Sequence, residues 1–460
     1  MTNQPKRTSD DIEYHKVPVN RKKRFILIGL GILLFSFFAY AVPRLPIITG
    51  YTAKEVCSCT FVAGRDEIRT EAEDVGYSPI NIASFSIDYE AKTVKSHLLW
   101  LASETAVYRP NLGCTLVHDM EESEVQNQKF NRPVTIQDTT LPFPYGNYVA
   151  DTIPNEINAD KLAAAMDFAM ECDGTRAALV IYKGQLVAEK YSEGFNESSK
   201  HLGWSMSKSI TNALYGIMVK KGIVKIDEPT NFANWEDERQ NIKIDDLLQM
   251  NSGLRWTEDY YDLCEVTKML FKNDDLGAYA AEAKVEFKPG EHWEYSSGTS
   301  NILAEIMEKR IGNQSAYWIF PYMELFNKIG ANSMILEADA SGTYVGSSYS
   351  WGTARDWARL GQLYLNDGLW NDGRILPKDW VEYSTTPAEG SDGIYGAQIW
   401  LNSKGKYLEG CPKDLYNFGG FNGQNVTMIP SKDLVIVRLG LNSIEKLDYA
   451  AFVRQVIDTL

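Results

Sequence analysis

The sequence is poor in three kinds of residue that mark common classes of protein. Its 460 residues include only 6 cysteines and 5 histidines, and 46 basic side chains face 61 acidic ones, a net charge of −15. Six cysteines in so long a chain argue against a disulfide-rich scaffold. The acidic balance argues against the basic surface that binds nucleic acid, so we expect no nucleic-acid partner. Five histidines supply a multi-histidine metal site poorly, and we expect neither a metal nor a cofactor.

Long apolar runs are also scarce, with one exception near the amino terminus. Residues 25–42 read FILIGLGILLFSFFAYAV, and these 18 positions without a charge are the lower limit for a helix that spans a bilayer. The basic cluster RKKR at 21–24 places the amino terminus in the cytoplasm by the positive-inside rule. We therefore expect a cytoplasmic tail over 1–24, a transmembrane anchor in the lipid bilayer over 25–42, and the rest outside, in the periplasm or the extracellular space.

A cleaved signal peptide is the alternative to an anchor. Ala39-Tyr40-Ala41 has the small-x-small pattern of a cleavage site, and cleavage near Ala41 would release a secreted protein. The 24-residue polar leader is long for a signal peptide, which favours the anchor. Either interpretation sends residues 43–460 out of the cytoplasm.

Export makes disulfides permissible, because they persist in oxidising compartments. Cys57 and Cys59 lie too close together for an easy mutual bridge, so we expect one of them to pair with Cys114. Cys264 and Cys411 are expected to form a second bridge. Free buried thiols and a metal site at 57–59 are the alternatives, and Cys172 has no assigned partner.

The exported part divides into an accessory region and a larger domain. Residues 43–150 lack strong helical periodicity and contain short alternating runs such as 80–87, which predicts mostly loops and short strands. The segment LPFPYG at 141–146 is typical of a linker, since two prolines and a glycine oppose regular structure. We expect the larger domain over 151–460.

The two ends of this larger domain carry matching signals. A helix capped by Asn158 precedes a hairpin, and far downstream a second hairpin precedes a closing helix with one apolar face. Mostly helical signals lie between them. This order predicts an α+β fold, with an antiparallel sheet built from both chain ends, flanking helices and an inserted helical subdomain. The hairpins are expected at 177–191, around Lys183-Gly184, and at 426–437, around 430–433.

The most informative chemistry lies at Ser205-Met206-Ser207-Lys208. Apolar residues at helical spacing follow, so Ser205 is expected at the start of a helix and Lys208 one turn later on the same side. A serine hydroxyl is a weak nucleophile until a base removes its proton. Burial and the positive end of a helix both lower a lysine pKa, which would allow Lys208 to act as that base. By itself this pattern also fits a capping serine followed by a solvated lysine.

Two further segments have the composition of a hydrolase site. Tyr295-Ser296-Ser297 precedes a helical segment, and a tyrosine there could relay protons to a leaving group if nearby cations favour its phenolate. Residues 419–424 read GGFNGQ before a predicted strand, and their glycines let the backbone approach a ligand closely. A strand N–H beside the N–H of the nucleophile would form an oxyanion hole.

In this order and spacing, the three segments resemble the penicillin-recognising serine hydrolases. The resemblance is closest to the class C β-lactamase-like branch, which includes esterases and 6-aminohexanoate-dimer hydrolase. Segments 246–254, DLLQMNSGL, and 353–365, TARDWARLGQLYL, are similar to that branch as well. The resemblance covers roughly residues 155–460 and implies a β-lactamase/transpeptidase-like fold.

The resemblance also implies roles for particular residues. Ser205 would be the acylated nucleophile, Lys208 would activate it, and Tyr295 would protonate the leaving group. The backbone N–H groups of Ser205 and Gln424 would hold the oxyanion. The residues expected to contact a substrate are Trp204, Ser297, Phe421, Asn422 and Gly423.

Two departures from the β-lactamase pattern bear on the substrate. Ser297 stands where those enzymes have an asparagine, and Phe421-Asn422-Gly423 stands where they have Lys-Thr-Gly. The second change removes the cation that meets a substrate carboxylate. We therefore expect a membrane-anchored envelope serine hydrolase that acts on a small ester or amide. The alternatives are a β-lactamase or DD-peptidase-like activity and a non-catalytic envelope binding protein of the same fold.

A Ser-His-Asp hydrolase fits the sequence poorly. Residues 203–207, GWSMS, lack the last glycine of the nucleophile elbow, and no histidine occurs late in the chain, where the base of an α/β-hydrolase belongs.

Overall fold

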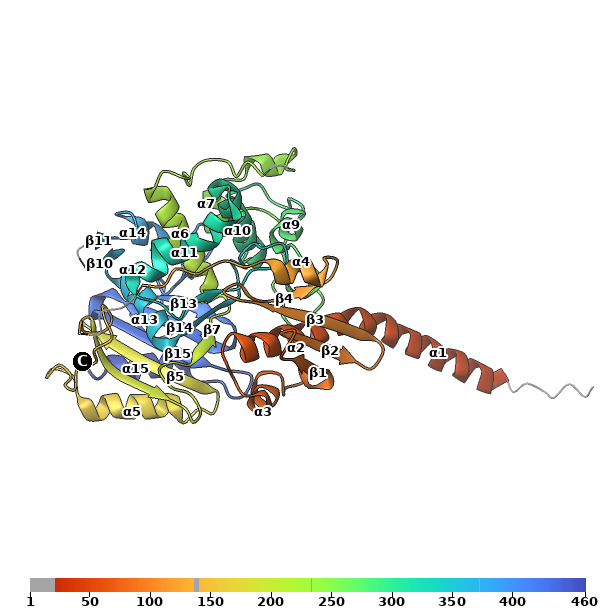
Figure 1. The fold of residues 1–460 in the computed structure, drawn as a ribbon, viewed down its shortest axis with the longest axis horizontal. Helices are drawn as coiled ribbons and strands as arrows, with labels where there is room; N and C mark the ends of the chain where they lie inside the picture. Colours follow the sequence, from red (N-terminus) through yellow and green to blue (C-terminus); the bar gives the residue numbers. More distant parts are fainter. Residues whose placement is uncertain (1–20, 136–139, 233, 372) are drawn as a thin grey trace, which may run out of the picture. The chain divides into compact units, whose positions relative to one another are not determined.

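The computed structural model describes residues 21–135, 140–232, 234–371 and 373–460, and it divides into two units, residues 1–44 and 45–460. In the first unit, helix α1 spans Arg21–Ala41 and a 3-10 turn, η1, spans Val42–Arg44 (Figure 1). Most of the predicted tail, residues 1–20, lies outside the described residues. Within the described part of the chain, one helical stretch, Phe25–Phe61, has the length and composition to cross a membrane, and its most apolar window is exposed. Such a stretch fits a membrane span or a signal sequence.

The second unit is organised around a six-stranded antiparallel sheet. Its order is β12-β13-β14-β15-β5-β6, so the last strand of the chain, β15, pairs with the early strand β5. This confirms the prediction of an antiparallel sheet assembled from both ends of the domain. The strands are β5 (Thr175–Tyr182), β6 (Gln185–Tyr191), β12 (Trp400–Leu401), β13 (Tyr416–Gly420), β14 (Gln424–Ile429) and β15 (Leu434–Gly440).

Strand β5 shows why helices cover both faces of this sheet. All eight of its residues are buried, and successive side chains of a strand point to opposite faces. Ala177, Leu179 and Ile181 join the main hydrophobic core, whereas Ala178 and Val180 join a second core. The second core holds the apolar sides of α5 (Ala159–Met170) and α15 (Tyr449–Ile457), and the main core holds those of α6 (Met206–Lys220) and α13 (Ala354–Leu365).

The inserted part lies between β6 and β12 and is mostly helical (Figure 1). A small sheet of order β7-β9-β8 connects it to the nucleophile segment. Its further helices are α7 (Ile244–Leu248), α8 (Glu265–Lys272), α9 (Leu276–Ala281), α10 (Ser297–Ile311), α11 (Gln314–Pro321), α12 (Asn327–Ile329) and α14 (Trp380–Thr385), and its strands are β7 (Lys200–Leu202), β8 (Ile335–Leu336), β9 (Ser350–Thr353), β10 (Leu369–Trp370) and β11 (Gly373–Arg374).

The accessory region contains a helix where loops and short strands were expected. Helix α2 (Leu45–Phe61) packs against a four-stranded antiparallel meander. Twelve of its 17 residues are buried, so it has no polar side to give the helical period that amphipathic helices show. The strands are β1 (Ser84–Asp88), β2 (Thr93–Leu98), β3 (Ala102–Arg109) and β4 (Gly113–Val117), and short helices α3 (Glu67–Arg69) and α4 (Glu122–Asn127) flank them.

A buried carboxylate fastens α2 to the rest of the unit. Glu337 accepts from Lys54 Nζ at 2.6 Å, from Ser58 Oγ at 2.8 Å, from Trp351 Nε1 at 2.9 Å and from the Cys114 backbone at 2.7 Å. Residues 45–460 consequently form one compact unit, and the accessory region is not separate from the larger domain. The expected linker at 141–146 is irregular but packed as well.

Of the two expected disulfides, one is present and the other is not. Cys57 on α2 and Cys114 on β4 form a disulfide, as predicted. The bridge between Cys264 and Cys411 was wrong, because both thiols are free and buried. Cys264 begins α8 in the main core, whereas Cys411 packs beside α15 in the second core.

Candidate active site

Ser205 lies at the tight turn between β7 and α6. It is the N-cap residue of α6, as predicted, and the preceding Trp204 has φ +48°, in the left-handed region that bulky side chains rarely adopt. Gly203 has no side chain because a Cβ there would lie 2.3 Å from the Trp357 ring. The turn is thus held in an unusual conformation, which is common where a structure positions a reactive group.

Lys208 reaches back to Ser205 from the first turn of α6. Its Nζ donates to Ser205 Oγ at 3.1 Å, to Ser297 Oγ at 2.9 Å and to the Ser347 carbonyl at 3.2 Å. Its side chain is 1% exposed. Burial lowers the pKa of Lys208 from 10.5 to about 8, and the negative charge of Glu258 opposes that change.

Glu258 is a member of the site that the sequence did not reveal. Its carboxylate accepts from the Ser297 hydroxyl, from the Ser297 N–H at 2.9 Å and from Trp256 Nε1 at 2.6 Å. A continuous chain of contacts therefore runs from Ser205 through Lys208 and Ser297 to Glu258. Ser297 joins the lysine to a carboxylate, and its contact with a substrate stays a prediction.

Tyr295 lies on the other side of the lysine. The Lys208 Nζ is 4.9 Å from the centre of its ring, and its hydroxyl interacts with Ser205. Burial, followed by the neighbouring Tyr395 and Glu258, raises the pKa of Tyr295 well above 10. The phenol is therefore neutral at pH 7, suited to donate a proton. The condition under which a phenolate could form, stabilisation by nearby cations, is therefore not met, because the pKa of Tyr295 is raised.

Aromatic rings surround the nucleophile. Tyr260, which the sequence did not single out, stacks on Phe421 with ring centres 5.1 Å apart, and both rings meet the edge or face of Trp204. The Tyr260 hydroxyl is buried beside Ser205 and Ser297 and has no well-aligned hydrogen-bond partner among the described residues. Tyr260 thus belongs to the buried polar groups around the nucleophile.

The glycine-containing segment meets the nucleophile turn at the end of β13. A Cβ at Gly420 would lie 2.2 Å from the Gly203 carbonyl oxygen, so the two backbones are in direct contact. Gln424 turns its side chain to the backbone of Gly440. The carbonyl oxygens of Asn422 and Gly423 accept from Arg438, so these two residues support the turn that follows β13.

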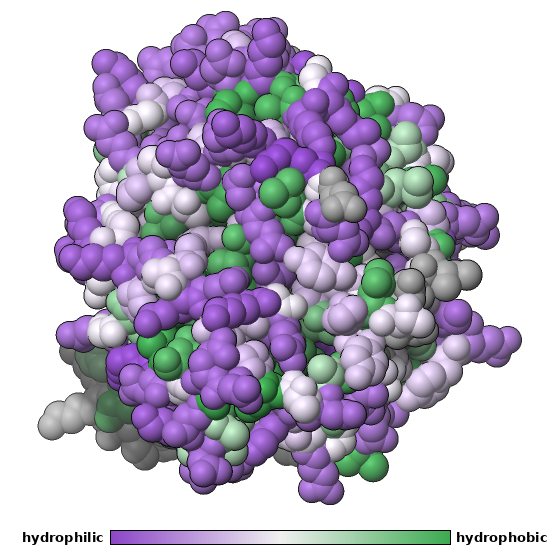
Figure 2. Space-filling view, turned by 90° about the vertical axis from the view of Figure 1, so that its left-hand side faces the viewer, coloured by the Kyte–Doolittle hydropathy of each residue, from purple (hydrophilic) through white to green (hydrophobic). Residues whose placement is uncertain are grey.

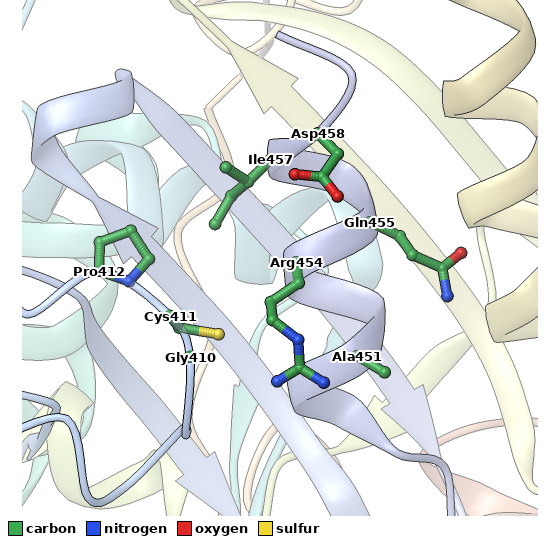
Figure 3. A pocket seen from close by; sticks show the side chains of 8 residues that line it. All are labelled: Gly410, Cys411, Pro412, Ala451, Arg454, Gln455, Ile457 and Asp458. Atoms are coloured by element: carbon green, nitrogen blue, oxygen red, sulfur yellow. The ribbon is translucent and has the colours of Figure 1, made fainter.

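Two other features do not form part of this site. A surface pocket of about 560 Å³ lies between α15 and the segment 410–412 and is lined by no candidate catalytic residue (Figure 3). Glu55, Cys59 and Asp74 bring potential metal ligands within 4.8 Å of one another. Arg65 donates to Cys59 Sγ at 3.3 Å and to Asp74 at 2.7 Å, so two of these three groups already have a guanidinium as partner.

Comparisons with known proteins agree with this geometry. A family model described as Beta-lactamase matches residues 170–440, more than half of the chain. The 6-aminohexanoate-dimer hydrolase of Paenarthrobacter ureafaciens is 26% identical over 298 residues, which cover 58% of this chain and 72% of that protein.

Solved structures show the same fold at low identity. A candidate 6-aminohexanoate-dimer hydrolase from Bacillus anthracis gives a TM-score of 0.54 at 20% identity, covering 72% of this chain and 86% of the other. A family VIII carboxylesterase gives 0.53 at 13% identity, covering 68% and 100%. The extent of the family match, together with the sheet order and the Ser-Lys pair, shows that the chain belongs to the β-lactamase family of serine hydrolases.

Proposed function

We propose that the protein hydrolyses an ester or amide through an acyl-enzyme on Ser205. The observation that carries this proposal is the contact of Lys208 Nζ with Ser205 Oγ at 3.1 Å, made by a buried lysine whose pKa is lowered to about 8. A lysine with that pKa is partly neutral near pH 7 and can accept the serine proton. Ser205 itself is partly exposed, so a substrate carbonyl can reach it.

In the first half-reaction, Ser205 Oγ bonds to the substrate carbonyl carbon while its proton passes to Lys208. The bond between the carbonyl carbon and the leaving oxygen or nitrogen then breaks. Tyr295 donates its proton to the leaving alcohol or amine, and the proton on Lys208 passes to the Tyr295 oxygen. In the second half-reaction, water attacks the acyl-enzyme, its proton is accepted by the same groups, and the acid leaves from a regenerated Ser205.

The oxyanion of each tetrahedral intermediate needs two N–H donors. The Ser205 N–H is one of them. The sequence pattern assigns the second N–H donor to Gln424. The contact of Gly420 with Gly203 favours a different donor, the N–H of Phe421, which follows Gly420 in the chain. We assign the second donor to the end of β13 on this ground.

The substrate is proposed to be uncharged near the scissile bond. Phe421 stands where the β-lactamases have the lysine of Lys-Thr-Gly, and it stacks with Tyr260 beside Trp204. Aromatic rings favour an apolar acyl or amine group, and they leave a substrate carboxylate without a charged partner. An ester or amide is therefore favoured over a β-lactam or a D-Ala-D-Ala end.

We further propose that the enzyme body lies outside the cytoplasm, anchored by residues 25–42 with the amino terminus inside. The charge cluster at 21–24 and the exposed apolar surface of α1 support this topology. The disulfide between Cys57 and Cys114 supports export, because such bonds are rare in a reducing cytosol. Release after cleavage near Ala41 is the alternative location.

The test is covalent labelling of the full chain by a fluorophosphonate, followed by intact mass measurement and hydrolysis of p-nitrophenyl esters. The wild type should gain the mass of one phosphonyl group, and Ser205→Ala should gain none. Ser207→Ala is the matched control, because its hydroxyl lies on the same helix but donates to the Trp204 carbonyl. If neither wild type nor control is labelled or hydrolyses ester, the chain is a binding protein. Turnover of penicillins as fast as of esters would favour the β-lactamase alternative.

A further inference from the structure

The tip of the β2–β3 hairpin is built from apolar residues. Residues 98–101 read Leu-Leu-Trp-Leu, and the Leu101 N–H closes the turn on the Leu98 carbonyl at 3.1 Å. Leu99 is 75% exposed and Trp100 is 88% exposed. Leu99 also adopts φ +50°, a conformation that glycine, asparagine and aspartate adopt more readily. A soluble turn would favour those polar residues, so the apolar tip needs another reason.

The exposed apolar residues of the tip differ from the face of the molecule that Figure 2 shows. On that face, apolar residues occur singly or in small groups among hydrophilic ones, as is normal for a soluble protein. Adjacent large side chains that are almost fully exposed on a protruding turn are unusual, and they mark a contact surface.

The direction in which the tip points follows from the packing of α2. Phe61, at the end of α2, packs on Tyr108 with ring centres 5.5 Å apart. Eleven residues earlier, a Cβ at Gly50 would lie 3.3 Å from Leu116, which pairs with Ala106. Moving back along α2 therefore moves from the far end of β3 towards its start. The chain of α2, followed back to its beginning, therefore runs towards the end of the sheet that carries the tip.

A short connection joins α1 to the start of α2. Helix α1 ends at Ala41, and α2 begins at Leu45 after the three residues of η1. Three residues span at most about 11 Å of extended chain. If α1 is the membrane anchor proposed above, the chain leaves the bilayer within that distance of the start of α2.

We propose that Leu99 and Trp100 insert into the interfacial layer of the bilayer as a second attachment point beside the anchor. Tryptophan prefers this layer, because its ring is apolar and its N–H can still meet water or a headgroup. Two points of attachment fix the orientation of the enzyme body, which a single helix with a three-residue connection does not. The inference rests on the proposed anchor and is independent of the hydrolase chemistry.

The test uses the full chain reconstituted into phosphatidylcholine vesicles with brominated acyl chains. Trp100→Cys carries a bimane label, and the control Ala91→Cys carries the same label in the exposed β1–β2 turn at the opposite end of the sheet. We expect several-fold quenching and a blue shift at position 100 and neither change at position 91. The unsubstituted chain corrects for labelling of native thiols.

Each other outcome overturns the proposal in a distinct way. A label at position 100 that is neither shifted nor quenched places the tip in water, and a shift without quenching places it against protein. Equal quenching at both positions shows a body that lies on the membrane without orientation. An alkaline carbonate wash tests the anchor separately, because a chain that lacks a membrane anchor is released from the vesicles by this wash. The hydrolase assay tests the proposed activity, and its result does not depend on where the tip lies.

Discussion

The charge on Glu258 should set the pH at which the enzyme becomes active. Burial lowers the pKa of Lys208 to about 8, while the negative charge of Glu258, held nearby through Ser297, raises that pKa. At pH 7 a lysine of pKa about 8 is neutral in about one molecule in ten, whereas one of pKa 10.5 is neutral in about one in 3,000. The site thus makes about 300 times more neutral base available than an exposed lysine would.

The rate of acylation is therefore expected to rise with pH and to level off above about pH 8, as Lys208 loses its proton. Replacing Glu258 by Gln removes a negative charge that stabilises the protonated lysine, so the rise should move to lower pH. The hydrogen-bonding shape of the side chain is kept, which limits any displacement of Ser297.

The measurement is the pre-steady-state burst of p-nitrophenol from pH 6 to 9.5 for the wild type and Glu258→Gln. Glu291→Gln is the control, because Glu291 is exposed and pairs only with Lys288 among its described ion-pair partners. A midpoint for Glu258→Gln equal to or above that of the wild type would refute the electrostatic role of Glu258. A rate independent of pH in the wild type would refute Lys208 as the base.

Three more predictions test the site and its support. Tyr295→Phe should lower kcat more than it changes KM in steady-state ester hydrolysis, because the lost hydroxyl donates its proton in the transition state; an unchanged kcat would remove it from the mechanism. Replacing Cys57 and Cys114 together by alanine should lower the unfolding free energy in urea by about 4 kcal/mol, from a loop closed over 57 positions; a change below about 1 kcal/mol would contradict that reasoning. Glu337→Gln leaves Lys54 buried without its carboxylate and should cost about 3–5 kcal/mol in the same assay, and wild-type stability would show that the pair is not required.

Local sequence signals were sufficient for the central sheet and for half of the site. The hairpin around Lys183-Gly184 consists of two largely apolar runs that flank a lysine and a glycine, both with positive φ, so its strands could be placed from sequence. Ser205 and Lys208 lie within one helical turn, and a single periodic helix fixes their relation. These features depend on residues that are near each other in the chain.

The features that were missed depend on contacts between distant segments. Glu258 and Tyr260 lie in a loop without regular period, and only the packing of that loop against α10 brings them to Lys208. Helix α2 has no polar face, because the sheet and the main core enclose it on all sides, and periodicity analysis therefore has nothing to detect. For Cys264 and Cys411, no local pattern could show that they belong to different cores.

The order of strands in the sheet has a consequence for when the enzyme can act during its synthesis. Strand β15 stands between β14 and β5, so the hairpin of β5 and β6 lacks its neighbour until residue 440 has been made. Gly420, whose backbone contacts the turn that carries Ser205, is also synthesised long after that serine. A growing chain that already contains Ser205 and Lys208 therefore has neither a closed sheet nor a complete oxyanion site. Under the proposed topology, hydrolysis begins only after nearly the whole chain has crossed the membrane, and the cytoplasm never meets an active form.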